Sequence, residues 1–200
     1  MCNRISLLIA FLFAACVTHA KFPLPAGYTL SKDANEVPLK LEKDFNQDGH
    51  KDLVAVMQKG EQVKIFAIIS KGAKAFRTIT HQDPSYFACC SSMEFIKGIV
   101  KFTTLGNRYF QTFSFRYNRQ LSNFELIGYD AESFGNAIHD GAGTQSLNLL
   151  TGRYMYTLYT AINEEDGKST EGNRRLKLPK KYTLSNFHEA LLFLEGLKME

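Results

Sequence analysis

Short segments in which apolar and polar residues alternate make up much of this chain, and they constrain its fold more than any other feature. Successive side chains of a strand point to opposite faces, so alternation predicts a sheet with one packed and one wet face. In residues 63–69, for example, Val63, Ile65, Ala67 and Ile69 would share one face, and in residues 108–117 aromatic side chains would share the packed face. Residues 53–57 come just before, and the intervening Lys59-Gly60-Glu61 predicts a hairpin.

Further strand-type segments follow in the rest of the chain. Gly106-Asn107 suits a tight hairpin turn between two long aromatic segments. Further strands are predicted in a series rich in aromatic and branched residues, at 75–80, 95–104, 108–117, 124–129, 146–150 and 153–159. One packed and one wet face indicate antiparallel pairing. The expected fold class is therefore mainly β (α+β), an antiparallel sheet domain.

One helix is expected, at the C-terminal end of the chain. Ser185 is the predicted N-cap, and the apolar stripe that follows has helical spacing, with Phe187, Ala190, Leu191, Leu194 and Leu197. Such a stripe predicts that the helix packs on the sheet. Residues 163–173 are polar and are expected to form a loop.

Residues 1–20 are typical of a secretory signal peptide. Arg4 is the only charged residue in a segment whose apolar run is too short to span a bilayer, and Ala20 offers a small residue for cleavage. The expected organisation is a signal at 1–20 and a single sheet-rich domain at 21–200. Cys16 follows small residues, so lipid attachment there is an alternative, and it is the only case in which we expect membrane contact.

Charge and cysteine content narrow the classes of function. The chain has 24 Lys and Arg against 20 Asp and Glu, which is too balanced to indicate a nucleic-acid partner. Outside the signal the cysteines are the neighbours Cys89 and Cys90. A strained vicinal disulfide, two buried thiols and bonds to other chains all remain open.

One motif carries definite chemistry. Residues 44–52 place oxygen-bearing side chains at positions 1, 3, 5 and 9 and glycine at position 6. Calcium takes six to eight oxygen ligands on a tightly curved backbone, which the glycine permits. The predicted ligands are the side chains of Asp44, Asn46, Asp48 and Asp52, with the backbone carbonyl of His50. The alternative is an ordinary turn without metal, in which Asp, Asn and Gly are also common.

The motif resembles the calcium loops of FG-GAP and VCBS repeats and of dockerin modules. In those loops the last aspartate runs into a strand, as Asp52-Leu53-Val54-Ala55-Val56 does here. The resemblance implies calcium as cofactor. The motif differs from that of the EF-hand, which has a glutamate at its twelfth position. Here that position is Ala55, and no flanking helices are expected.

A second resemblance covers three later segments, Phe113-Ser114-Phe115-Arg116-Tyr117, Phe124-Glu125-Leu126-Ile127-Gly128-Tyr129-Asp130 and Asn148-Leu149-Leu150-Thr151-Gly152. They are similar to a pattern in uncharacterised secreted bacterial proteins that also carry a calcium-type loop upstream. This resemblance implies a protein of the bacterial cell envelope and implies no activity.

No catalytic or cofactor-binding residues are predicted. His139-Asp140 are neighbours in a glycine-rich connector, His188 lacks a partner at metalloprotease spacing, and 164–166 is an acidic loop. We expect an exported, calcium-stabilised, non-enzymatic protein, periplasmic or secreted, that binds another envelope or periplasmic protein, with an inhibitor or immunity role among the options. The alternatives are a small periplasmic hydrolase whose site is dispersed in sequence, and a structural component of the envelope.

Overall fold

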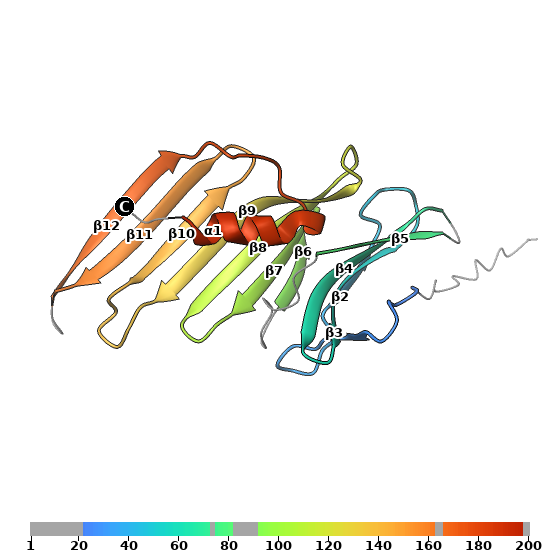
Figure 1. Ribbon diagram of the computed structural model, residues 1–200, viewed down its shortest axis with the longest axis horizontal. Coiled ribbons are helices and arrows are strands. Elements are labelled where there is room, and N and C mark those ends of the chain that lie inside the picture. The colour runs from blue at the N-terminus through green and yellow to red at the C-terminus, as the bar shows by residue number, and fades with distance from the viewer. Residues whose placement is uncertain (1–21, 73–74, 82–91, 163–165, 198–200) are drawn as a thin grey trace, which may run out of the picture.

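The computed structural model describes residues 22–72, 75–81, 92–162 and 166–197, and it is mostly β structure (Figure 1). Its strands form two antiparallel sheets, and a C-terminal helix packs on them. The expected fold class is confirmed. The predicted signal at 1–20, Cys89 and Cys90 lie outside the described residues.

The first sheet contains the N-terminal strands. They are β1 (Thr29–Leu30), β2 (Lys40–Lys43), β3 (Asp52–Lys59), β4 (Gln62–Ser70) and β5 (Phe76–Thr80). The central strands β3 and β4 form the hairpin that Lys59-Gly60-Glu61 predicted. β3 pairs with both short strands β1 and β2, and β5 closes the other edge.

The second sheet is a meander of seven strands, each paired with its neighbour in sequence. They are β6 (Ser92–Ile96), β7 (Ile99–Leu105), β8 (Tyr109–Asn118), β9 (Asn123–Phe134), β10 (Ala142–Asn148), β11 (Arg153–Ala161) and β12 (Gly167–Arg175). The predicted hairpin at Gly106-Asn107 joins β7 to β8. Local connections of this kind let alternating segments pair with little chain between them.

Two strand predictions need correction. Residues 95–104 are not one strand, because Lys97 and Gly98 adopt positive φ (50° and 82°) and turn the chain between β6 and β7. The predicted polar loop at 163–173 is wrong from Gly167 onward, where β12 pairs along the whole of β11. β12 is an edge strand and largely exposed, and polar or charged residues suit such an edge.

The helix α1 (Phe187–Glu195) follows a short 3-10 turn, η1 (Leu184–Asn186). Ser185 is therefore not its N-cap. Thr183 precedes the turn and its N–H donates to Oδ1 of Asn186 at 2.6 Å, while Ser185 Oγ accepts a hydrogen bond from Asn123 on β9. Helix-like structure begins earlier than predicted because Tyr182 and Leu184 are buried and draw the preceding chain onto β9.

The main core lies between the two sheets and under α1. It joins one face of β3 and β4 to aromatic residues of the second sheet and to the helix stripe, for example Val54, Ile65, Phe102, Phe113 and Phe187. Phe187 makes edge-on ring contacts with Phe113 and Phe115 at 5.0 and 5.3 Å between centroids. A smaller cluster covers the other face of the first sheet beneath the N-terminal segment. In Figure 1 the helix crosses one face of the large sheet.

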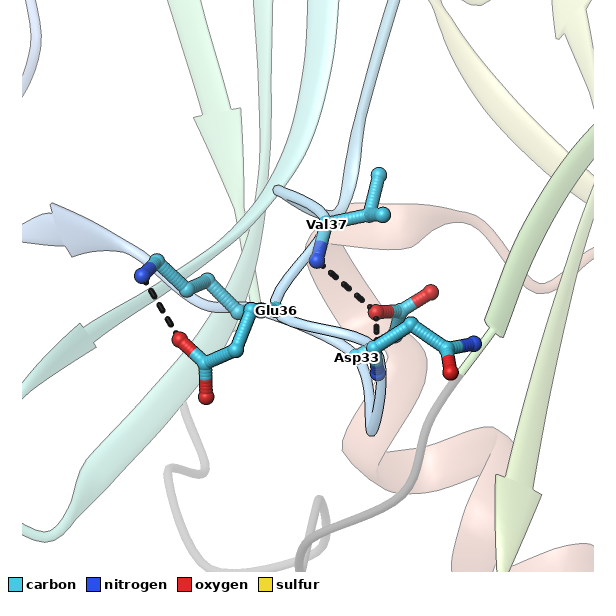
Figure 2. Close-up of polar contacts among 5 residues, drawn as sticks. Asp33, Glu36 and Val37 are labelled. Atoms are coloured by element: carbon cyan, nitrogen blue, oxygen red, sulfur yellow. Dashed lines mark hydrogen bonds and ion pairs between the residues drawn. The ribbon is translucent and has the colours of Figure 1, made fainter.

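In a compact turn between β1 and β2, one carboxylate and backbone hydrogen bonds close the chain (Figure 2). Oδ1 of Asp33 accepts hydrogen bonds from the backbone N–H of Asn35 and of Val37, at 2.8 and 2.9 Å. Lys32 and Glu36 form an exposed ion pair beside it. Asp33 therefore has a structural role in this turn.

No helix in the described part of the chain has the length and apolar character needed to cross a membrane.

Candidate calcium loop

The candidate loop, residues 44–52, connects β2 to β3 and is anchored by its last residue. Asp52 begins β3 and is fully buried. Its Oδ2 accepts hydrogen bonds from the N–H groups of Phe45 and Asn46, at 2.8 and 3.2 Å, and its Oδ1 accepts from Ser70 at 2.7 Å. Burial raises the pKa of Asp52, and these three donors act against that rise.

The start of the loop curls around two side-chain oxygens. Oδ1 of Asp44 and Oδ1 of Asn46 both accept from the backbone N–H of Asp48, at 3.1 and 2.9 Å. The other oxygen of Asp44 accepts from the N–H of Gly49 at 2.9 Å. Oxygens from two different residues thus lie within hydrogen-bond distance of the same backbone nitrogen. Gly49 has φ of +87°, so the position where the motif requires glycine does adopt the bend.

Asp48 completes the cluster and connects it to the first sheet. Its carboxylate accepts hydrogen bonds from the N–H of His50 at 2.8 Å and from the hydroxyl of Ser70 at 2.9 Å. The amide of Asn46 also donates to it, at 3.1 Å. Slight burial raises the pKa of Asp48, but these hydrogen bonds outweigh it and leave the pKa below the ordinary value of 3.8.

The loop also contacts the second sheet. Phe45 is buried and its ring meets those of Phe95 and Phe124 edge-on, each at 5.3 Å between centroids. Arg119, in the turn between β8 and β9, donates through Nε to the carbonyl of Asn46 at 3.0 Å and contacts Gln47. Phe45 and Arg119 were not among the predicted site residues. No spacing in the sequence links Arg119 to a loop more than seventy positions away.

The side-chain oxygens of the loop are of the kind that calcium binds. A carboxylate has about four acceptor sites and an amide oxygen two. By that count the hydrogen bonds above leave at least one site on each of Asp44, Asn46, Asp48 and Asp52. With the carbonyl of His50, these oxygens would hold the ion and water would complete the shell of six to eight ligands. Bound calcium would supply charge neutralisation among the carboxylates.

Two observations limit that fit. Among the described residues, no group of three or more His, Cys, Asp and Glu side chains is placed to hold a metal ion. Of the three carboxylates in the loop, Asp52 is buried and already accepts three N–H donors. Calcium here would therefore rest mainly on Asp44 and Asp48, with neutral oxygens from Asn46 and His50.

His139 and Asp140, which the sequence analysis discounted as catalytic, have structural roles. Oδ1 of Asp140 accepts from the N–H of Ala161 at 3.0 Å, and the carbonyl of His139 accepts from Ala142, so both close the connector between β9 and β10. Of the acidic segment 164–166, residues 164 and 165 lie outside the described residues.

Comparison of this chain with protein-family models, with curated proteins and with solved structures gives no match.

Proposed function

We propose that this protein is an exported, non-enzymatic binding protein of the cell envelope, and that calcium in the 44–52 loop braces its two sheets. One observation carries the calcium part. The side-chain oxygens of Asp44 and Asn46 converge on a single backbone nitrogen, with the Asp48 carboxylate beside them, in a loop that contacts both sheets.

The contrast with the turn at Asp33 supports this proposal. There one carboxylate oxygen accepts from two backbone N–H groups, and backbone hydrogen bonds complete the turn. The longer 44–52 loop uses three carboxylates and an amide oxygen to accept from its backbone N–H groups. A calcium ion bound by Asp44 and Asp48 would neutralise their charge and stabilise the loop.

A brace at this position would act on the packing of the two sheets. Phe45 lies in the main core, and Asp52 joins the loop to Ser70 at the end of β4. An ion that binds only the folded loop would stabilise the folded state by mass action. Its role would be structural, with partner binding left to another surface of the domain.

The experiment is a thermal melt of the purified protein with calcium, with magnesium and with chelator, together with a pull-down from envelope extract. We expect calcium alone to raise the melting temperature by several degrees and the pull-down to recover a specific protein. Identical melts in calcium and chelator, with calorimetry showing no binding at millimolar calcium, would refute the brace. Failure to recover a partner in either buffer would count against the binding role.

A further inference from the structure

The large sheet has a second face that carries neither the helix nor the first sheet. Tyr129, Leu147 and Tyr154 belong to the main core. Their sequence neighbours Asp130 and Ser146 therefore point to the opposite face, because side chains alternate along a strand. In Figure 1 the helix crosses only one face of this sheet.

That opposite face is hollowed into a groove of about 800 Å³ across strands β8 to β12. The strand register places its side chains in two parallel rows. The first row is Thr112, Asp130, Ser146, Met155 and Asn173. The second row is Phe110, Glu132, Thr144, Thr157 and Glu171. At a strand spacing of about 4.8 Å, five strands span roughly 20 Å, the length of about six extended residues.

The charge in the groove is opposite in sign to that of the chain. The chain as a whole has a formal net charge of +4. The residues lining the groove include the carboxylates of Asp130, Glu132 and Glu171 and no Lys, Arg or His. Ser146 donates to Asp130 at 2.7 Å, and Thr144 and Thr157 are hydrogen-bonded to each other at 2.9 Å. These hydroxyl groups are hydrogen-bonded to one another or to Asp130. Among the lining residues, no cation neutralises the three carboxylates.

One end of the groove is apolar. Phe110 contacts Phe134 edge-on at 5.3 Å between ring centroids, and Leu105 lies opposite Phe110 on β7. All three are more than one-third exposed, at 37%, 39% and 38%. Exposed aromatic residues beside a polar groove offer an anchor for an apolar side chain. Beyond the first row, on the side away from Phe134, the next row of side chains includes Arg153 and Arg175. Arg175 donates to the carbonyl of Thr151.

We infer that this groove binds an extended cationic segment of a partner protein. Its lysine or arginine side chains would lie along Asp130, Glu132 and Glu171, and an apolar side chain would pack against Phe110 and Phe134. Charge complementarity selects this occupant, since a nucleic acid or an anionic surface would be repelled. The inference rests on the proposed binding role and adds the surface and the chemistry of the partner.

The test is fluorescence anisotropy of a labelled peptide of alternating lysine and phenylalanine, titrated with the purified protein in calcium buffer. A peptide of the same length with glutamate in place of lysine is the ligand control. We expect the cationic peptide to bind, to bind more weakly as salt rises, and to outcompete the acidic peptide. No binding of the cationic peptide, or equal binding of both peptides, would overturn the inference.

Variants locate the binding. The triple change Asp130→Asn, Glu132→Gln and Glu171→Gln should weaken the cationic peptide about tenfold or more. Phe110→Ser should also weaken it, whereas Glu61→Gln, in the exposed β3–β4 turn, should bind like wild type. Circular dichroism checks each fold. The single change Glu171→Gln, on the exposed edge strand, gives a milder variant if the triple one misfolds.

Wild-type affinity in a folded triple variant, or in Glu171→Gln alone if the triple variant misfolds, would overturn the groove as the site. The calcium-dependent melt and the pull-down do not depend on this outcome. If calcium raises the melting temperature and the pull-down recovers a partner but the cationic peptide does not bind, only the cationic groove is rejected.

Discussion

Ser70 and Asp52 join the candidate loop to the first sheet through a hydrogen bond of 2.7 Å from the backbone N–H of Ser70 to Oδ1 of Asp52. The hydroxyl of Ser70 donates in turn to Asp48. One residue at the end of β4 therefore contacts two acids of the loop. Asp52 is fully buried and organises the backbone, whereas Asp48 is exposed. Their substitutions should behave differently.

We expect Asp52→Asn to lower the free energy of unfolding by about 1–3 kcal/mol, because an amide nitrogen cannot accept and at least one buried N–H would lose its partner. Removing a buried charge offsets part of this loss. Urea unfolding in chelator measures the effect without metal. Asp33→Asn is the matched control. It retains the one oxygen used in an exposed turn, so its stability should stay close to that of wild type. Equal stability of the two variants would show that Asp52 does not anchor the loop.

The calcium effect should depend on the exposed acids. If calcium is present at about one hundred times its dissociation constant, it adds roughly 2.7 kcal/mol to stability. Asp48→Ala or Asp44→Ala should abolish the rise in melting temperature with calcium, since each removes a charged ligand. His50→Ala should largely preserve it, because only the backbone carbonyl is used.

Asp33→Ala provides the control for general damage. It should lower stability equally in calcium and in chelator, because its carboxylate closes a separate turn. A calcium effect that survives loss of both Asp44 and Asp48 would assign the ion to another site.

Acid should reveal the hydrogen bonds to Asp48. Its pKa in the folded protein lies below the ordinary value of 3.8, chiefly because the His50 N–H and the Ser70 hydroxyl outweigh the effect of burial. The ionised carboxylate therefore contributes stability that is present above about pH 4 and lost as pH falls through the folded pKa.

The stability difference between wild type and Asp48→Asn, measured in chelator, should accordingly shrink on acidification. Asp52, whose pKa burial raises, contributes in the opposite sense in both proteins and cancels in this comparison. A difference that stays constant from pH 7 to pH 3 would show that the folded pKa of Asp48 is not lowered.

Phe45 should couple the loop to the core. Its ring contacts Phe95 on β6 and Phe124 on β9 while its N–H donates to Asp52. Phe45→Ala should cost about 3 kcal/mol through the lost burial and the cavity left behind, and Phe45→Leu clearly less. Chemical denaturation measures both. A loss below about 1 kcal/mol for alanine would mean that the loop does not depend on this contact.

The sequence by itself determined the strands, because apolar alternation at the strand period is a local property. β8 and β11 lie where that pattern placed them, whereas β3 and β4 are buried on both faces and were located by their apolar runs and the turn between them. It also determined the bend at Gly49, since the conformation follows from the residue and its neighbours. β12 escaped prediction because an edge strand exposed on both faces buries too little to impose alternation.

Only the tertiary structure decided what the acids of the chain do. The spacing of the motif makes Asp44, Asp48 and Asp52 equivalent donors, yet β4 buries Asp52 and gives it the N–H of Ser70. Likewise Asp130, Glu132 and Glu171 are unremarkable strand residues until the register of β9 to β12 sets them in one groove. Burial and neighbours far apart in sequence arise from long-range pairing, which no local pattern contains.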